Sequence, residues 1–169
     1  MTQPTLLPVE VVTDKYTRSS VTADKNTLYI FTDNNNRTSK PDASTENVDK
    51  NLWYYKKYSL LNFPIHFGTI HNPTSAVIRG LQNAYPISTM SAYGTNWLPR
   101  ELNTFKSVID DEIEQIKKDM HLFKRIKISN SRIGQGGLKA KIPNLLQEYL
   151  DTKLLEIGID NTGDKPKAV

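Results

Sequence analysis

The stretch Leu28-Tyr29-Ile30-Phe31-Thr32-Asp33-Asn34 predicts the fold class of this chain. Four apolar residues run without a break before the chain becomes polar at Thr32. A short apolar run rich in aromatic and branched side chains is typical of a strand buried on both faces, and such strands lie in the middle of α/β sheets. Ligands of open α/β sheets bind beyond the carboxyl ends of the strands. The polar residues that follow Phe31 are therefore the first place to expect a site.

Periodicity and capping residues predict the other elements. Residues 9–13 and 123–129 alternate between apolar and polar side chains, which is typical of strands. Pro86 disfavours helical geometry at the residue before it, so we expect residues 85–90 to be extended. Asn72-Pro73 is a typical helix start, and apolar spacings of three and four indicate two further helices. The predicted helices are residues 73–83, a long helix that begins at 96–99 and reaches 120, and residues 140–157.

An acidic run lies within the long predicted helix and is followed by two lysines. Glu114 and Lys118 have the spacing of a favourable i,i+4 ion pair. We interpret the run as a solvated helix face rather than as a pair of catalytic carboxylates. Its members are Asp110, Asp111, Glu112, Glu114, Lys117 and Lys118.

Length and composition favour one soluble domain. The chain has 169 residues, and we assign residues 1–159 to a single domain and residues 160–169 to a flexible C-terminal tail. No apolar stretch approaches the roughly 20 residues that a membrane helix needs. The N-terminus also lacks the pattern of a signal peptide. We therefore expect a cytoplasmic protein without a membrane partner.

Charge and residue usage narrow the classes of function. The 22 Lys and Arg against 18 Asp and Glu give a formal charge of +4, which fits either an ordinary surface or attraction for an anionic ligand. No run of like charges indicates a nucleic-acid partner. The absence of cysteine excludes disulfides, thiolate zinc sites and cysteine catalysis. His66, His71 and His121 have no metal-binding spacing, so we expect neither a metal nor a cofactor.

The first candidate site is the polar loop that begins at Thr32 and Asp33. Its Asn and Asp residues are typical of turns. In the functional interpretation, Asn34 hydrogen-bonds a ribose or a base and Arg37 clamps a phosphate. Both interpretations remain open from the sequence.

The second candidate is Gly134-Gln135-Gly136-Gly137, between a predicted strand and a predicted helix. Glycines allow backbone N–H groups to approach a phosphate, and a helix N-terminus adds partial positive charge. The spacing matches neither a Walker A loop nor the dinucleotide-binding glycine pattern. A tight turn is the alternative.

Two further features could contribute to a site. The run Leu52-Trp53-Tyr54-Tyr55-Lys56-Lys57-Tyr58 is either a short amphipathic helix or an aromatic wall that stacks on a base. Arg79 lies among apolar residues in Ala76-Val77-Ile78-Arg79-Gly80-Leu81. An arginine in such surroundings contacts a ligand, forms a buried ion pair, or reaches the surface.

These motifs together resemble a family of short, largely uncharacterised proteins common in bacteriophages and gut bacteria. The family pattern is YxFTDNxxRxSG, then WYxKKY, then TxAVIRGLxNAxPIST, then an acidic amphipathic helix. The resemblance covers about Tyr16 to Leu155, and Lys40 stands where the family usually has glycine. The matching residues are Tyr29 to Asn34 with Arg37 and Ser39, Trp53 to Tyr58, and Thr74 to Thr89.

More distantly, the chain is similar to macro-like α/β proteins, which have a YVFGDN strand and loop, an R-x-x-x-NA-x-GIPT block and a closing GxGxG loop. The resemblance implies a single three-layer domain, with a mixed sheet flanked by helices. It also implies that Arg37, Arg79 and the residue 134–137 amides hold phosphates, and that Asn34 and Asn83 hold ribose or base. The full set of implied ligand-binding residues is Thr32, Asp33, Asn34, Arg37, Trp53, Tyr54, Arg79, Asn83, Thr89, Gly134, Gln135, Gly136 and Gly137.

The function that the resemblance implies is binding of a nucleotide-derived small molecule, of ADP-ribose or cyclic-nucleotide type. For a phage protein this suggests an anti-defence sponge that sequesters a host immune signal in the host cytoplasm. One alternative is an ADP-ribose or nucleotide hydrolase in which Asp33 activates water. Another is an inhibitor that binds a host protein through the acidic helix or the aromatic run. A homo-oligomer remains open.

Overall fold

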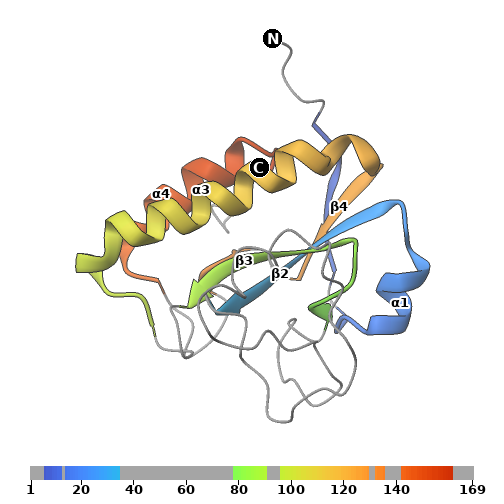
Figure 1. Cartoon of the computed structure of the whole chain (residues 1–169), viewed down its shortest axis with the longest axis horizontal. Helices are drawn as coiled ribbons and strands as arrows, with labels where there is room; N and C mark the ends of the chain where they lie inside the picture. Colours follow the sequence, from blue (N-terminus) through green and yellow to red (C-terminus); the bar gives the residue numbers. More distant parts are fainter. Residues whose placement is uncertain are drawn as a thin grey trace, which may run out of the picture.

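A computed structural model of the chain describes residues 6–12, 14–34, 78–90, 96–129, 132–135 and 142–161, with the backbone alone at residue 34. The described strands form one four-stranded sheet in the order β1-β4-β2-β3 (Figure 1). All three pairings are parallel, although a mixed sheet was expected. The α/β class itself is confirmed. The strands are β1 (Val9–Val11), β2 (Thr27–Asn34), β3 (Ala84–Met90) and β4 (Arg125–Ile128).

The central position predicted for residues 28–32 is confirmed, because β2 pairs with β4 on one side and β3 on the other. Leu28 and Ile30 face one hydrophobic cluster, while Tyr29 and Phe31 face a second cluster across the sheet. Successive side chains of a strand point to opposite faces, so a continuous apolar run suits a strand covered on both.

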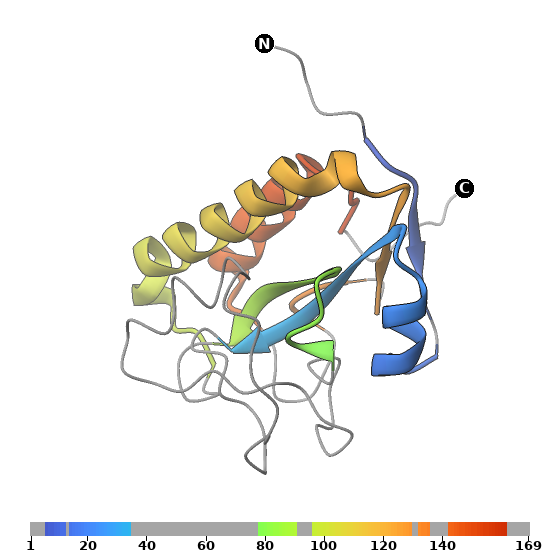
Figure 2. The ribbon, with the colours of Figure 1, turned by 45° about the vertical axis from the view of Figure 1, so that its right-hand side comes forward.

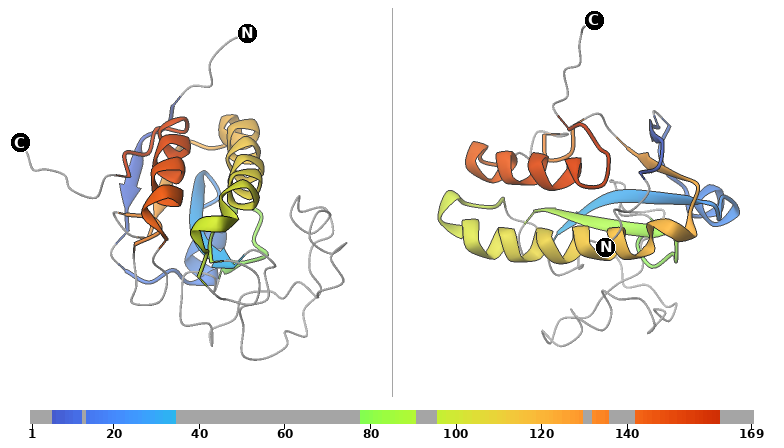
Figure 3. Two further views of the ribbon diagram at one scale, coloured as in Figure 1. Left: turned by 90° about the vertical axis from the view of Figure 1, so that its left-hand side faces the viewer. Right: turned by 90° about the horizontal axis from the view of Figure 1, so that it is seen from above.

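Two long helices cover one face of the sheet. Helices α3 (Leu102–Asp119) and α4 (Asn144–Leu155) lie side by side over it (Figures 1 and 3). The stripe predicted for the long helix is buried, because its members recur on the face turned to the sheet. Short 3-10 turns at η4 (Pro99–Glu101) and η5 (Met120–Leu122) flank α3.

The opposite face of the sheet is covered differently. Helix α1 (Arg18–Ala23) packs there (Figure 2), and its Val21 joins the second cluster with Phe31 and Ile78. The side chain of Thr17 caps the helix by accepting the backbone N–H of Ser20. The described helices therefore flank both faces of the sheet, as in a three-layer arrangement.

The helix predicted for residues 73–83 is wrong for residues 79–83, which form turns. From Ile78 onward the chain makes two successive tight turns, with Leu81 N donating to Ile78 O and Ala84 N donating to Leu81 O. Gly80 has a φ of +101°, a left-handed conformation that a regular right-handed helix excludes. This glycine lets the chain turn sharply into β3.

The packed part of the chain extends two residues beyond the domain boundary predicted at residue 159. Asn161 is 1% exposed, and its side chain accepts from Ile133 N and donates to Ile133 O. Within the described parts of the chain, none of the helices has the length and apolar character needed to cross a bilayer.

Candidate functional site

An ion pair joins the carboxyl end of β2 to the turn that precedes β3, two segments that are far apart in sequence. Asp33, at the end of β2, accepts two hydrogen bonds from Arg79, at 2.8 Å from Nε and 2.5 Å from Nη2. Both side chains are fully buried. Asp33 follows Tyr29 and Phe31 on the same face of β2, because strand side chains alternate. We call the carboxyl ends of β2 and β3 the carboxyl edge.

The geometry shows that Arg79 forms a buried ion pair and does not reach the surface. The Arg18 guanidinium fixes the backbone there by donating to Arg79 O at 2.8 Å. Parallel bidentate bonds give such a pair strength and a defined orientation. Asp33 occupies the edge of the guanidinium that carries Nε and Nη2. The pair is therefore suited to organising the carboxyl edge from beneath.

A second buried carboxylate lies at the same edge. Glu112 of α3 is fully buried and accepts from Ser88 N at 2.9 Å and from Ser88 Oγ at 2.5 Å. Ser88 O in turn accepts from the indole N–H of Trp97 at 3.0 Å. The prediction of a solvated acidic face is therefore wrong for Glu112.

The rest of the acidic run contacts its own domain as well. Asp110 accepts from the Tyr149 hydroxyl and lies 3.5 Å from Lys153 Nζ on α4. Glu114 is 66% exposed, and its carboxylate lies 3.3 Å from Lys117 Nζ. Asp110 thus contacts α4, whereas the predicted solvated face is confirmed for Glu114.

The ladder between β2 and β3 is irregular at the carboxyl edge. Asp33 pairs with Ser88, but Asn34 pairs with Met90, so Thr89 is an extra residue on β3. Thr89 is 4% exposed and Thr32 is half-buried. An extra residue in one strand bends it and changes the direction of the following side chains. Four expected site residues, Thr32, Asp33, Asn34 and Thr89, therefore lie at this edge, where Thr32 and Asp33 point to opposite faces of the sheet.

The loop after β4 leaves the same edge, since the strands are parallel. Gly134 has a φ of +100°, and a Cβ there would lie 2.5 Å from Gln147 Oε1. Gln135 N donates to Arg132 O, and the Gln135 amide donates to Ile142 O and Gln147 Oε1. The described part of the glycine motif is thus a tight turn held against the start of α4.

A buried amide network supports this turn from the other side. The Gln147 amide donates to Ile133 O at 3.0 Å and to Asp151 Oδ1 at 2.8 Å. Asn161 also donates to Asp151 Oδ1, at 2.7 Å. Each buried amide therefore has specific partners, which gives the loop one defined conformation.

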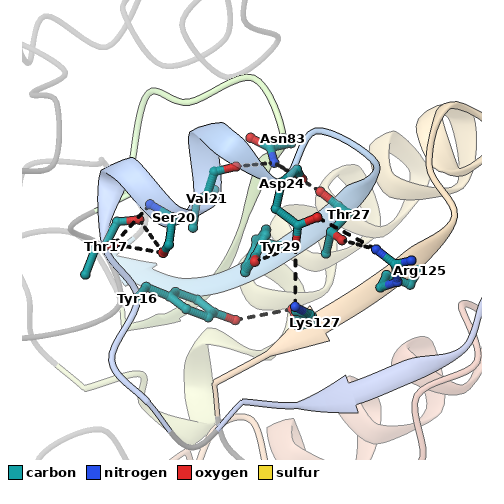
Figure 4. Close-up of polar contacts among 10 residues, drawn as sticks. All are labelled: Tyr16, Thr17, Ser20, Val21, Asp24, Thr27, Tyr29, Asn83, Arg125 and Lys127. Atoms are coloured by element: carbon teal, nitrogen blue, oxygen red, sulfur yellow. Dashed lines mark hydrogen bonds and ion pairs between the residues drawn. The ribbon is translucent and has the colours of Figure 1, made fainter.

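Asn83 lies away from the carboxyl edge. It precedes β3 at the amino end, and its amide donates to the carbonyl oxygens of Val21, Asp24 and Thr27 at 3.0–3.1 Å (Figure 4). This side chain joins α1, the following turn and β2. The structure therefore separates Asn83 from the other expected site residues.

Asp24 is the centre of a second polar group at the amino end (Figure 4). It accepts from the Tyr29 hydroxyl at 2.8 Å and lies 3.4 Å from Lys127 Nζ. Burial favours a raised pKa for Asp24, but hydrogen bonds from Tyr29, Thr27 and Lys127 outweigh it and lower the pKa. Burial, reinforced by Asp24, raises the pKa of Tyr29 to about 12. A tyrosine that holds its proton so firmly is suited to structure rather than to nucleophilic catalysis.

Five of the expected site residues lie outside the described part of the chain. They are Arg37, Trp53, Tyr54, Gly136 and Gly137. Among the described residues, no group of three or more His, Asp or Glu side chains could hold a metal ion.

Two buried polar residues that were not among the expected site residues have a signal in the sequence, namely their position within an apolar helix stripe. Glu112 lies three residues after Ile109 and four before Ile116, within the apolar stripe of α3. Gln147 lies three residues before Leu150 and seven before Leu154 on the buried face of α4. A polar residue within an apolar stripe must have partners when it is buried. No comparable periodic signal precedes Asn161.

These features define a small α/β protein with a parallel sheet and a polar carboxyl edge. Residues 11–153 match the sequence profile of a family described as "Family of unknown function (DUF7831)", so the chain belongs to that family. Neither the curated proteins nor the solved structures contain a significant match to the chain.

Proposed function

We propose that this protein binds a nucleotide-derived small molecule at the carboxyl edge of β2 and β3. The observation that supports this most is the buried bidentate pair between Asp33 and Arg79. A buried ion pair is costly to desolvate and is a poor source of net stability. Its position at the carboxyl end of the central strand, where α/β sheets bind ligands, favours a role in shaping a site.

The proposed ligand is an anion of ADP-ribose or cyclic-nucleotide type. This class rests on the resemblance of the FTDN-xx-R and AVIRGLxNAxPIST motifs to a phage and gut-bacterial family, and more distantly to macro-like proteins. Arg37 and the amides of residues 134–137 would hold phosphates, and Trp53 or Tyr54 would stack on the base. Arg79 would position the strand end, because its Nε and Nη2 bind Asp33.

Sequestration fits the geometry better than hydrolysis does. A general base must reach a water molecule with an accessible carboxylate oxygen. Both oxygens of Asp33 accept from Arg79, and the side chain is fully buried. A protein that binds the ligand without converting it would serve as a sponge for a nucleotide signal, and in a phage this would be an anti-defence role.

Thermal shift and native mass spectrometry against ADP-ribose, cyclic dinucleotides and NAD test the proposal. We expect one of these compounds to stabilise the protein and to be recovered unchanged. The Arg37→Ala variant should lose about tenfold or more in affinity, the range of a charge-assisted hydrogen bond. Arg100→Ala is the matched control, since Arg100 is exposed on η4.

The other outcomes separate the alternatives. Recovery of the ligand as product would establish the hydrolase and make Asp33 the first residue to substitute. Failure of every compound to bind would overturn the proposal and favour the inhibitor of a host protein. Equal loss of affinity in Arg37→Ala and Arg100→Ala would contradict the phosphate contact assigned to Arg37.

A further inference from the structure

The side chains of Glu112 and Trp97 form hydrogen bonds with three atoms of Ser88. Its backbone N–H and hydroxyl donate to the two carboxylate oxygens of Glu112, and its carbonyl oxygen accepts from Trp97. Ser88 and Glu112 are fully buried, and Trp97 is 2% exposed. Trp97 is held in turn by an edge-to-face contact with Phe105 at 5.3 Å between ring centroids.

The phase of the ladder explains why Ser88 needs these partners. Tyr29 N donates to Asn83 O, and in a parallel ladder alternate residues of a strand bond to the same neighbour. Residues 85 and 87 of β3 thus face β2, whereas Pro86 and Ser88 face away from it. Pro86 has no N–H to satisfy on that side, but Ser88 has both a donor and an acceptor.

The contact lies directly before the register shift. Ser88 is the last β3 residue in register with β2, and Thr89 is the extra residue before Met90. Irregularities of this kind occur next to active sites, where they redirect side chains. The groups that hold Ser88 therefore define where the regular ladder ends.

We infer that Glu112 is a positioning residue for the carboxyl edge: with Trp97 it fixes Ser88, and so maintains the shift at Thr89 that directs the end of β3. The inference rests on the proposed function, because the site it serves is the ligand site proposed above. An apolar residue would suit this place in the helix stripe, between Ile109 and Ile116. A carboxylate buried there requires desolvation, which its two Ser88 donors offset.

The inference predicts a local effect of removing the carboxylate. In Glu112→Gln, an amide N–H₂ replaces one of the two oxygens that accept from Ser88. We expect the protein to fold, and the amides of residues 88–90 to exchange hydrogen about tenfold faster or more. The amides of β4, at Ile126 and Ile128, should keep their exchange rates. The compound that stabilises the wild-type protein should bind about tenfold more weakly, by the same loss of one charged hydrogen bond.

Two further variants keep the test decisive. Trp97→Phe retains an aromatic ring against Phe105 but removes the N–H donor. We expect it to produce the same local pattern of exchange, so it can replace Glu112→Gln in the test if that variant does not fold. Glu114→Gln makes the same chemical change at an exposed position of α3 and should change neither exchange nor binding.

The outcomes are distinct from those that test the ligand itself. Unchanged exchange at residues 88–90, a uniform increase across all strands, or undiminished ligand binding in a folded Glu112→Gln protein would overturn the inference. If the wild-type protein binds none of the panel compounds, the proposed function fails. The comparison of hydrogen-exchange rates between the wild-type protein and Glu112→Gln then still tests whether Glu112 fixes the end of β3.

Discussion

Asp33 and Arg79, 46 residues apart in sequence, form a fully buried ion pair with two hydrogen bonds of 2.5 and 2.8 Å. The pair joins the carboxyl end of the central strand to the turn that leads into its neighbour. Arg79 is also tied to α1 through the bond from Arg18 to its carbonyl oxygen. The arrangement therefore connects three segments beneath the carboxyl edge.

Removing one charge of this pair should destabilise the fold strongly. Asp33→Asn leaves the Arg79 guanidinium buried without its counter-charge, and we expect the free energy of unfolding to fall by about 3–5 kcal/mol. The double variant Asp33→Leu/Arg79→Met should recover much of this loss, because apolar pairs of similar volume often replace buried ion pairs without cost. Urea denaturation measures all three proteins.

The exposed ion pair of Glu114 with Lys117 provides the control for the Asp33→Asn measurement. Glu114→Gln should change the free energy of unfolding by only about 0–1 kcal/mol, as is usual for surface pairs. If Asp33→Asn costs no more than Glu114→Gln, the buried pair does not have the structural role assigned to it.

Removing the amide group of Asn83 should lower the free energy of unfolding. In Asn83→Ala the carbonyl oxygens of Val21, Asp24 and Thr27 lose the side-chain donor, although Val21 O and Asp24 O each keep a backbone N–H. We expect a loss of about 1–3 kcal/mol. Asn83→Asp should cost more, because a carboxylate would face the three carbonyl oxygens. Chemical denaturation measures both variants.

Asn103→Asp is the matched control for this prediction. Asn103 is exposed in the first turn of α3, where a negative charge is favourable. Equal stability of Asn83→Asp and Asn103→Asp would show that the Asn83 amide does not secure the amino end of the sheet.

Two glycines with positive φ allow strain and crowding to be separated. Gly134→Ala should lose more stability than Gly158→Ala, because its Cβ would lie 2.5 Å from Gln147 Oε1 and 2.8 Å from Ile142 Cδ1. At Gly158 the nearest atom is a Leu6 methyl at 3.6 Å, so only the backbone penalty of about 1–2 kcal/mol applies. Crowding should add about 1–3 kcal/mol at Gly134. Thermal unfolding of the two variants compares them, and equal losses would contradict the packing described for the loop after β4.

Stability should fall at alkaline pH. Burial, with the hydrogen bond and charge of Asp24, raises the pKa of Tyr29 from 10.0 to about 12 in the folded state. Above pH 10 the unfolded chain releases this proton while the folded protein retains it, so stability present below pH 10 is lost as the pH rises to about 12. Tyr149 contributes with the same sign, because burial and Asp110 raise its pKa to about 12.

Denaturation across this pH range, with tyrosinate absorbance followed in parallel, measures the effect. Tyr29→Phe removes one titrating group, so its stability should decline less steeply above pH 10. A decline as steep as that of the wild-type protein would show that Tyr29 does not contribute to the alkaline loss.

Much of the fold could be predicted from local patterns. The unbroken apolar run at residues 28–31 indicated a central strand, and the stripe through Phe105, Ile109 and Ile116 indicated the long helix. Both patterns repeat within a few residues, because side-chain direction follows the period of the backbone. Pro86 likewise indicated the change to extended structure that begins at Ala84.

The partners of the polar residues depended on contacts between distant segments. The sequence selected Asp33 and Arg79 as separate candidates, and folding joined them in one ion pair. It grouped Asn83 with the ligand residues, but the direction of β3 places Asn83 at the other end of the sheet. It assigned Glu112 to solvent, although the packing of α3 buries that carboxylate against Ser88. Periodicity sets which way a side chain points along its own element, whereas burial and pairing depend on what the rest of the chain brings to it.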